Sequence, residues 1–354
     1  PAELVEMREV ARLRFAAARN VELVVLPPDE IDTCLTRFFA SKGLGGFDKT
    51  RAIDLLAAND NTPAVKLANS LLRMAIDRNA SDVHIHPYLG GGAIRFRIDG
   101  RLRRITTVTD EMLGAVARYF KAQAGLDSSP LIAQDGRLRL AYGRREIDVR
   151  LSVLPAYDGV RIVCRLLDQS RNFSLQQSHF TPAAQQTLRR MTNNSAGIVL
   201  LTGPTGSGKT STLYALLAEL NAVDINIMTI EDPVEYVLPG ISQVQVNEKQ
   251  GMTFAESLRA ILRQDPDVVL VGEIRDGETA RIASQAALTG HLVLSTLHTN
   301  DALGSLPRML DLGVEASILA DALLGVVSQR LIRRLCPACR QPTKAPYFAT
   351  DQEF

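Results

Sequence analysis

The sequence predicts an α/β fold in which a domain built on a parallel sheet, residues 183–354, follows an α+β domain, residues 59–168. In the later region, continuous apolar runs alternate with helical segments, which is typical of the buried strands of a parallel sheet. In the earlier region, apolar and polar residues alternate along the chain, which is typical of half-buried antiparallel strands. The polar, weakly patterned residues 169–182 lie between these regions and are interpreted as a linker.

Length, composition and charge limit the class of protein. The chain has 354 residues, and at about 100–200 residues per domain this length predicts two domains with a fragment of a third. Hydrophobic residues make up 46% and charged residues 22%, which is typical of a globular protein rather than a disordered one. The net charge of +1 gives no electrostatic argument for nucleic acid as the main partner.

No segment predicts membrane insertion or export. The longest apolar candidate, residues 314–332, contains acidic and basic side chains, whereas a membrane span needs about 20 predominantly apolar residues. No signal peptide opens the sequence. We therefore expect a cytoplasmic protein.

The region before the linker combines helices and strands. Residues 1–58 contain two helical patterns around a short apolar run and are interpreted as a fragment of an N-terminal helical region. Helices are predicted over residues 64–78 and 110–124. The run AIRFRIDGRLRRI alternates around Asp99-Gly100, which predicts two strands joined by a hairpin turn.

The later region carries four apolar runs that predict buried strands, namely GIVLLTG, INIMTIED, DVVLVGE and HLVLSTL. The first of them leads into GPTGSGKT, Gly203–Thr210, which fits the phosphate-loop pattern G-x-x-x-x-G-K-[ST] at every defined position. A helical pattern follows, which gives the strand–loop–helix context that the motif requires. The sequence therefore predicts an ATP site.

Each part of this loop has a physical role. Backbone N–H groups surround the phosphates, and the helix N-terminus adds its dipole. Lys209 would reach the β- and γ-phosphates, and the Thr210 hydroxyl would hold Mg²⁺. The predicted ATP-binding residues are Gly203, Pro204, Thr205, Gly206, Ser207, Gly208, Lys209, Thr210 and Ser211.

Carboxylates follow two other apolar runs. DPDVVLVGE resembles a Walker B strand, but Gly272 stands where the acidic metal partner usually lies, so Glu273 is the predicted Mg²⁺ partner, directly or through water. TIEDPVEY carries Glu231, Asp232 and Glu235 at the end of its strand, the edge at which parallel α/β sheets bind ligands. A carboxylate there is placed to orient and deprotonate the attacking water.

The motifs GPTGSGKT, TIEDPVE, VGEIRDGETA and TGHLVLSTLHTNDA occur in this order. With them the chain resembles the type II secretion and type IV pilus ATPases of the secretion-ATPase superfamily, over about residues 60–340. In that family they are the Walker A, Asp, Walker B and His boxes. The resemblance implies a PAS-like N-terminal domain joined flexibly to a RecA-like ATPase domain, and a hexameric ring with ATP sites between the two domains.

The resemblance also implies roles for residues outside the phosphate loop. Glu235 becomes the general base, Glu273 the Mg²⁺-linked carboxylate and His298 a sensor of the γ-phosphate. His291 is a weaker candidate, and a packed histidine at the start of a strand is an equal alternative for it.

Arginines complete the implied site. The segment RLSVLPAYDGVRIVCRLL matches the family's strand pair that brings arginines to the nucleotide, which implies Arg150 and Arg165, and after them Arg161. Arginine suits this role because its planar, permanently charged fork stabilises charge on the transferring phosphoryl group.

The sequence departs from the family pattern in its histidines and cysteines. SDVHIHP has His86 where the family has an acid, and the alternating strand residues His84 and His86 are interpreted as structural rather than as a metal-binding pair. Family members that assemble pili or secrete typically carry two C-x-x-C pairs that hold one zinc, whereas this chain has one such pair, Cys336 and Cys339.

A structural zinc ion takes four ligands, so these two cysteines form at most a partial site. The second pair either lies beyond residue 354 or has been lost, and we do not expect zinc in this chain. The remaining cysteine pair favours an assembly or secretion motor over the retraction ATPases, which generally lack it.

The predicted function is a Mg²⁺-dependent ATPase that powers pilin or pseudopilin assembly. The resemblance implies a homo-hexamer that works with an inner-membrane platform protein, at the cytoplasmic face of the inner membrane and without nucleic acid. One alternative is a RecA-like nucleic-acid or conjugation motor, which the near-neutral charge and the lack of a DNA-binding module disfavour. Another is a nucleotide-binding regulator with negligible turnover, which the combination of Glu235, Glu273 and the arginines disfavours.

Overall fold

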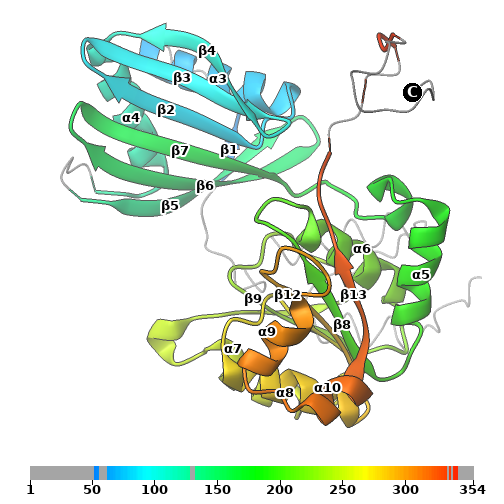
Figure 1. The fold of residues 1–354 in the computed structure, drawn as a ribbon. Coiled ribbons are helices and arrows are strands. Elements are labelled where there is room, and N and C mark those ends of the chain that lie inside the picture. Colours follow the sequence, from blue (N-terminus) through cyan, green and yellow to red (C-terminus); the bar gives the residue numbers. More distant parts are fainter. Residues whose placement is uncertain (1–51, 56–61, 128–131, 333–334, 336–337, 342–354) are drawn as a thin grey trace, which may run out of the picture. The chain divides into compact units, whose positions relative to one another are not determined.

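The computed structural model describes residues 52–55, 62–127, 132–332, 335 and 338–341 (Figure 1). The predicted N-terminal helical fragment therefore lies almost wholly outside the described residues, as does Cys336. Apart from Ala52, the described residues belong to one unit, Ile53–Phe354, which contains two β-sheets.

The first sheet, called sheet A, is the core of the α+β part. Its seven strands lie in the order β1 (Ile53–Asp54), β5 (Gln134–Tyr142), β6 (Arg145–Ala156), β7 (Gly159–Asp168), β2 (Asp82–Tyr88), β3 (Gly91–Ile98) and β4 (Arg101–Val108). Neighbouring strands are antiparallel, except that β1 pairs with β5 in parallel. The helices α3 (Pro63–Asp77) and α4 (Asp110–Gln123) pack against one face and bury its apolar residues.

The hairpin turn in this part forms as predicted, and the structure adds a helix cap. Asp99 (φ 50°) and Gly100 (φ 76°) form the turn between β3 and β4, since a tight hairpin requires positive φ at its central residues. Thr109 caps α4 by accepting a hydrogen bond from the Met112 N–H. The hairpin turn and the start of α4 are therefore each defined by one or two residues.

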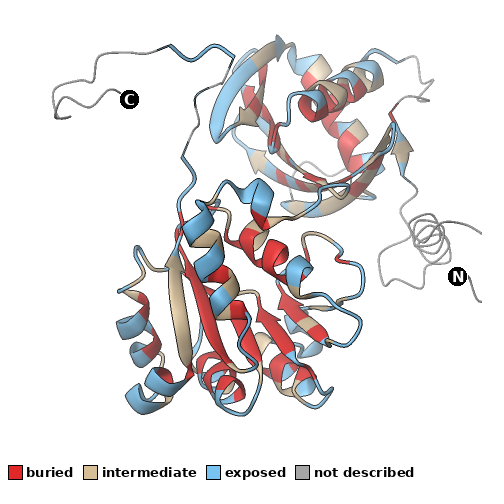
Figure 2. Cartoon of the chain, turned by 90° about the vertical axis from the view of Figure 1, so that its right-hand side faces the viewer, coloured by how far each residue is buried: buried red, intermediate tan, exposed pale blue. Residues whose placement is uncertain are grey.

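The second sheet, called sheet B, is the core of the α/β part. Its six strands lie in the order β10 (Ser242–Gln245), β9 (Ile227–Glu231), β11 (Val268–Val271), β12 (Leu292–Leu297), β8 (Gly197–Thr202) and β13 (Leu323–Ser328), and all pairs are parallel. Every residue of β8, β11 and β12 is buried, as the red central strands of Figure 2 show. The predicted α/β fold with a parallel sheet is confirmed.

Helices cover both faces of sheet B. The apolar core on one face includes α5 (Pro182–Thr192) and α6 (Lys209–Leu220). The core on the other face includes α7 (Phe254–Ile261), α8 (Gly277–Leu288), α9 (Ser305–Asp311) and α10 (Ala316–Ala322). Two-sided coverage explains why the strands read as continuous apolar runs.

Both edge strands of sheet B were absent from the predicted strand set. β10 has the polar sequence SQVQ and lies beside β9. β13 has the sequence LLGVVS and lies beside β8, although it follows directly on α10. Adjacent β-branched Val326 and Val327 favour the extended form, but a run this short does not reveal its partner strand.

Part of the predicted linker packs onto sheet B. A short 3-10 helix spans Leu175–Ser178, and Leu175 is fully buried in the α5/α6 core. The Phe173 ring makes edge-to-face contacts with Tyr214 and Tyr236, at centroid distances of 5.2 and 4.9 Å. Leu175 and Phe173, together with Phe180, which packs against the same core, therefore anchor a mostly polar segment.

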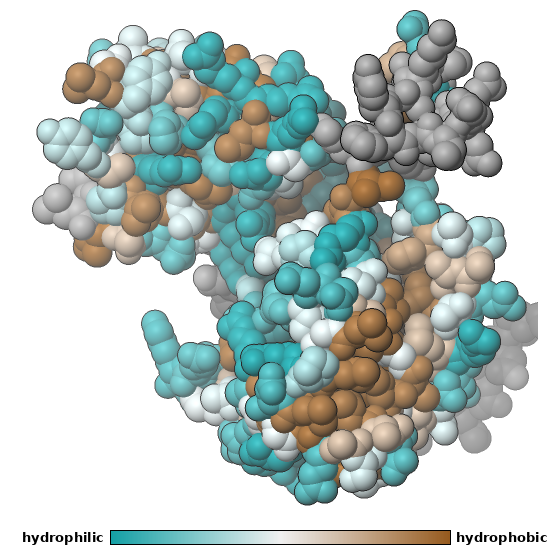
Figure 3. Space-filling view, in the orientation of Figure 1, coloured by the Kyte–Doolittle hydropathy of each residue, from teal (hydrophilic) through white to brown (hydrophobic). Residues whose placement is uncertain are grey.

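The surface of the α/β part is uneven. Of the helices that the structure describes, none has the length and apolar character of a membrane span. Apolar side chains gather over α9, α10 and β13 on the face seen in Figure 3. On α9, Leu306 and Leu310 are 38% and 44% exposed.

Candidate nucleotide-binding site

The predicted site residues follow the carboxyl ends of the strands of sheet B. In the strand register, Leu297 of β12 lies opposite Thr202 of β8, and β11 and β9 end beside them. The phosphate loop (residues 203–210), Glu273 and His298 therefore emerge at one edge of the sheet. This is the edge at which parallel α/β sheets bind ligands.

The phosphate loop has the backbone that the motif requires. Gly206 (φ 77°) and Gly208 (φ 89°) adopt left-handed conformations that favour glycine. Helix α6 begins without a side-chain cap, so its first N–H groups are available to an anion. The Ser207 hydroxyl oxygen is buried and has no hydrogen-bond partner among the described residues. A buried, unsatisfied donor in this loop fits a ligand that supplies acceptor oxygens.

Lys209 lies against the loop. Its side-chain Nζ donates hydrogen bonds to the Gly203 carbonyl at 2.8 Å and to the Pro204 carbonyl at 3.2 Å. Burial lowers the pKa of this ammonium group, and the Glu273 carboxylate opposes that shift. Phosphate oxygens are stronger acceptors than carbonyls for such a group, so Lys209 is placed to bind them.

Glu273 and His298 lie together, as predicted for one site. The Glu273 side chain is 14% exposed, and its carboxylate oxygens lie 2.6 Å from Arg275 Nη2 and 3.3 Å from His298 Nε2. Carboxylate and hydroxyl oxygens are suitable Mg²⁺ ligands. The oxygens of Glu273 and of Thr210, which follows Lys209 in the first turn of α6, therefore fit the ion.

Glu231, the last residue of β9, and Glu235, which follows it, occupy different environments. Glu231 is buried, and its carboxylate accepts hydrogen bonds from Tyr214, Thr229 and Gln243. Glu235 is half-buried, and its charge raises the pKa of Arg150, against the larger opposite effect of burial. The Glu231 carboxylate is thus held by hydrogen bonds within the fold, whereas the Glu235 carboxylate interacts electrostatically with Arg150.

Arginines form a row across the face of sheet A that lies opposite α3 and α4. Strand pairing places Arg137 opposite Arg150, Arg150 opposite Arg165, and Asp82 between Arg165 and Arg97. The Asp82 carboxylate lies 3.2 Å from Arg165 Nε and 3.5 Å from Arg97 Nε. Like charges on facing strands destabilise a sheet. An anionic ligand bound to this row would offset the repulsion between its arginines.

Arg150 and Arg165 differ in their contacts. Arg150 Nη2 donates a hydrogen bond to the Val234 carbonyl at 2.8 Å, next to Glu235. Gln169 Nε2 donates to the Glu235 carbonyl at 3.0 Å. Arg165 is instead paired with Asp82, and Arg161 lies on β7 opposite Leu154, outside the row.

The two histidines on β2 lie in this arginine-rich face. His84 is 7% exposed, and neither of its ring nitrogens has a hydrogen-bond partner among the described residues. Burial lowers the pKa of both His84 and His86, and neighbouring arginines lower it further. The lowered pKa values favour the neutral form of both rings. Nowhere in the described ranges do three or more His, Cys, Asp or Glu side chains form a group that could hold a metal ion.

His291 lies away from the phosphate loop. It precedes β12, at the opposite end of that strand from His298, and its Nδ1 lies 3.0 Å from the Ala286 carbonyl. This position agrees with the packed histidine considered as the alternative. Cys339 is exposed, and the partial zinc site is not described because Cys336 lies outside the described residues.

Sequence reasoning missed Gln329. It is 9% exposed and follows β13, and its side chain reaches the phosphate loop through a hydrogen bond from Nε2 to the Ser207 carbonyl at 2.9 Å. The missing signal was the pairing of β13 with β8, because that pairing alone brings residue 329 to the loop.

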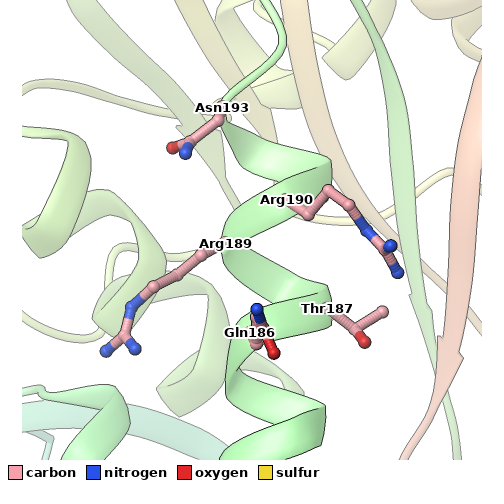
Figure 4. A pocket seen from close by; sticks show the side chains of 5 residues that line it. All are labelled: Gln186, Thr187, Arg189, Arg190 and Asn193. Atoms are coloured by element: carbon pink, nitrogen blue, oxygen red, sulfur yellow. The ribbon is translucent and has the colours of Figure 1, made fainter.

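A separate hollow is lined by residues of α5, namely Gln186, Thr187, Arg189, Arg190 and Asn193 (Figure 4). The guanidinium groups of Arg189 and Arg190 project to opposite sides of the helix. Arg189 is moreover paired with Glu219 at 2.8 Å. These basic groups do not converge on one ligand, so the hollow adds nothing to the nucleotide site.

Comparisons with known proteins give a matching family and similar relatives. The family model for type II/IV secretion system proteins matches residues 57–353. Type II secretion system protein E of Klebsiella pneumoniae is 50% identical, over 98% of this chain and 72% of its own length. The protein of the same name from Dickeya dadantii is 54% identical, over 85% of this chain. The match covers 60% of that relative.

Solved structures show the same fold. The pilus retraction motor PilT with bound ADP is 30% identical, with a TM-score of 0.57 over 74% of this chain and 78% of that one. The ATPase DotB of Legionella pneumophila has a TM-score of 0.64 over 79% of this chain and 80% of its own, at 24% identity. The likeness to DotB is one of fold alone.

Proposed function

The chain belongs to the type II/IV secretion system protein family, and on this premise we propose that it is a Mg²⁺-dependent ATPase that powers a secretion or pilus machine. The names of its relatives favour type II secretion. The observation that carries the proposal is the intact phosphate loop, with Lys209 against it and Glu273 and His298 at the same strand edge.

Each residue has a defined part in the proposed hydrolysis. The phosphate loop and Lys209 bind the β- and γ-phosphates. Glu235 accepts a proton from a water molecule while the oxygen of that water bonds to the γ-phosphorus. The bond between the γ-phosphorus and the bridging oxygen that leaves with ADP breaks. Arg150 and Arg165 stabilise the charge on the transferring group, and His298, held by Glu273, contacts the γ-phosphate.

Thr210 and Glu273 would hold Mg²⁺, either directly or through water. When bound, the ion neutralises charge that develops on the phosphate oxygens. The Glu273 carboxylate also lies 2.6 Å from Arg275. When the ion is bound, this carboxylate would therefore interact with both the ion and Arg275. We do not include zinc, because two cysteines supply only half of a tetrahedral site.

The proposal also covers the oligomeric state of the chain and its location in the cell. The chain would work as a homo-hexamer on the cytoplasmic side of the inner membrane and would bind a platform protein there. Membrane association would come through that partner. The finding that supports this part is family membership.

Glu235→Gln tests the proposal. The substitution keeps the size of the side chain but removes the base, so we expect hydrolysis to fall by about 100-fold or more. Binding of a fluorescent ADP analogue should stay within about threefold, because Glu235 contacts the water and not the ADP phosphates. ATPase assays and fluorescence titration measure the two effects.

The matched control is Glu248→Gln, which changes an exposed glutamate in a short 3-10 helix. It should leave both values unchanged. Full hydrolysis by the Glu235 variant would remove the general-base assignment. A native chain that binds no nucleotide would remove the proposed function as a whole.

A further inference from the structure

Gln329 contacts the phosphate loop at both ends and the first helix after it. Its backbone N–H donates to the Thr202 carbonyl at 2.9 Å, where the loop begins. Its side-chain Nε2 donates to the Ser207 carbonyl at 2.9 Å, two residues before α6 begins. Its Oε1 accepts a hydrogen bond from the Thr212 hydroxyl of α6, also at 2.9 Å.

The orientation of the amide follows from these partners. A carbonyl oxygen only accepts, so the NH₂ end of Gln329 must face Ser207. The Oε1 end then faces Thr212, whose hydroxyl donates. Glutamine meets all of these demands, and a glutamate at this position would bring a second acceptor to the Ser207 carbonyl.

The contacts fix peptide units that bear on phosphate binding. The Ser207 carbonyl and the Gly208 N–H belong to one trans peptide, in which they point in opposite directions. Anchoring the carbonyl on Gln329 therefore turns the Gly208 N–H away from Gln329. The bond to the Thr202 carbonyl orients the Gly203 N–H in the same way. Inward-facing N–H groups are what a phosphate loop presents to its ligand.

Gln329 packs closely against two glycines of the phosphate loop. A Cβ added at Gly208 would lie 2.8 Å from Gln329 Nε2, and one added at Gly203 would lie 2.4 Å from the Gln329 carbonyl oxygen. Two glycines of the motif are thus required by the contact with this residue as well as by their backbone angles. Arg330 Nη1 in turn donates to the Gln329 carbonyl at 2.9 Å.

We propose that Gln329 is a positioning residue of the nucleotide site, which orients the Gly203 and Gly208 N–H groups toward the phosphates by holding the peptides on either side of the loop. It acts through the loop and touches neither substrate nor metal. The inference rests on the proposed function for the identity of the ligand, and its structural part holds without turnover.

The experiment compares Gln329→Glu and Gln329→Met in the full chain, with two readouts. Hydrogen exchange of residues 203–212 without nucleotide reports whether the loop is held. Titration with a fluorescent ADP analogue reports binding. We expect faster exchange in this segment, and an ADP affinity reduced by about 5- to 10-fold for the methionine variant. The loss should be greater for the glutamate variant, whose carboxylate also repels the phosphates.

Several outcomes decide the inference. Thr212→Val leaves the donor to Ser207 in place, so its effect should be smaller, and it should be non-additive with Gln329→Met. Gln285→Glu on α8, an exposed position, is the control for an added charge. Unchanged exchange, or faster exchange with unchanged ADP affinity, in a methionine variant with native thermal stability would overturn the positioning role. Absence of nucleotide binding by the native chain would refute the proposed function, and the exchange comparison would still test the contact.

Discussion

Asp82 is the acidic residue in a row that otherwise consists of arginines. Its side chain is 8% exposed, and it lies between Arg97 and Arg165 on the neighbouring strands. Since like charges on adjacent strands repel, a buried carboxylate between two guanidinium groups stabilises the sheet. It also holds Arg165 at a fixed place on β7, and in the proposed site that arginine has to meet phosphate.

Asp82→Asn should therefore destabilise the protein. The substitution keeps the size of the side chain but removes the charge that offsets two arginines, and we expect a loss of about 1–3 kcal/mol in the free energy of unfolding. The loss should shrink at high salt, because ions screen the remaining repulsion. Urea unfolding at low and high salt measures both effects.

The control is Asp99→Asn, in the exposed turn of the β3–β4 hairpin. Asparagine tolerates positive φ as well as aspartate does, so stability should change little there. Equal stabilities of the Asp82 and Asp99 variants would show that the arginine row needs no counter-ion.

At the scale of elements, the segment between the two sheets depends on a few apolar anchors. Leu175 is fully buried although its neighbours in the 3-10 helix are polar. Phe173 joins Tyr214 of α6 and Tyr236 in an aromatic cluster. Tyr214 in turn donates its hydroxyl to the buried Glu231. The segment thus belongs to the same core that supports the end of β9.

Leu175→Ala should lower the free energy of unfolding by about 2–5 kcal/mol, because it leaves a cavity in this core. The exposed Leu303, at 80%, provides the matched control, and Leu303→Ala should stay within about 0.5 kcal/mol of the native chain. Thermal or chemical unfolding measures both variants. Equal stabilities of the Leu175 and Leu303 variants would mean that the packing of residues 173–178 on sheet B does not contribute to the free energy of unfolding.

At the scale of the whole molecule, the proposed function concerns an assembly of chains. A site that is complete only in an oligomer gains activity by mass action as the protein concentration rises. We therefore expect ATP hydrolysis to increase more than linearly with protein concentration, together with the appearance of a ring-sized species in light scattering. Constant activity per chain from a monomer would leave a phosphate-loop ATPase and remove the hexamer from the proposal.

The candidate site could be predicted from the sequence where the chemistry is local. Residues 203–210 carry the loop glycines, the lysine and the threonine within one short segment, and the backbone angles at Gly206 and Gly208 follow from it. Glu273 and His298 were predictable as neighbours, because parallel strands place their carboxyl ends at one edge. The choice of Glu235 over Glu231 came from resemblance, and the burial of Glu231 under three hydrogen bonds supports it.

The sequence by itself determined the periodicities of both sheets, the Asp99-Gly100 turn and the phosphate loop, because each depends on residues close together in the chain. Only the tertiary structure decided which distant residues meet. Gln329 reaches Ser207 because β13 pairs with β8, and Asp82 meets Arg165 because β2 pairs with β7. The pairing of distant strands depends on the packing of the whole core, and no local pattern encodes it.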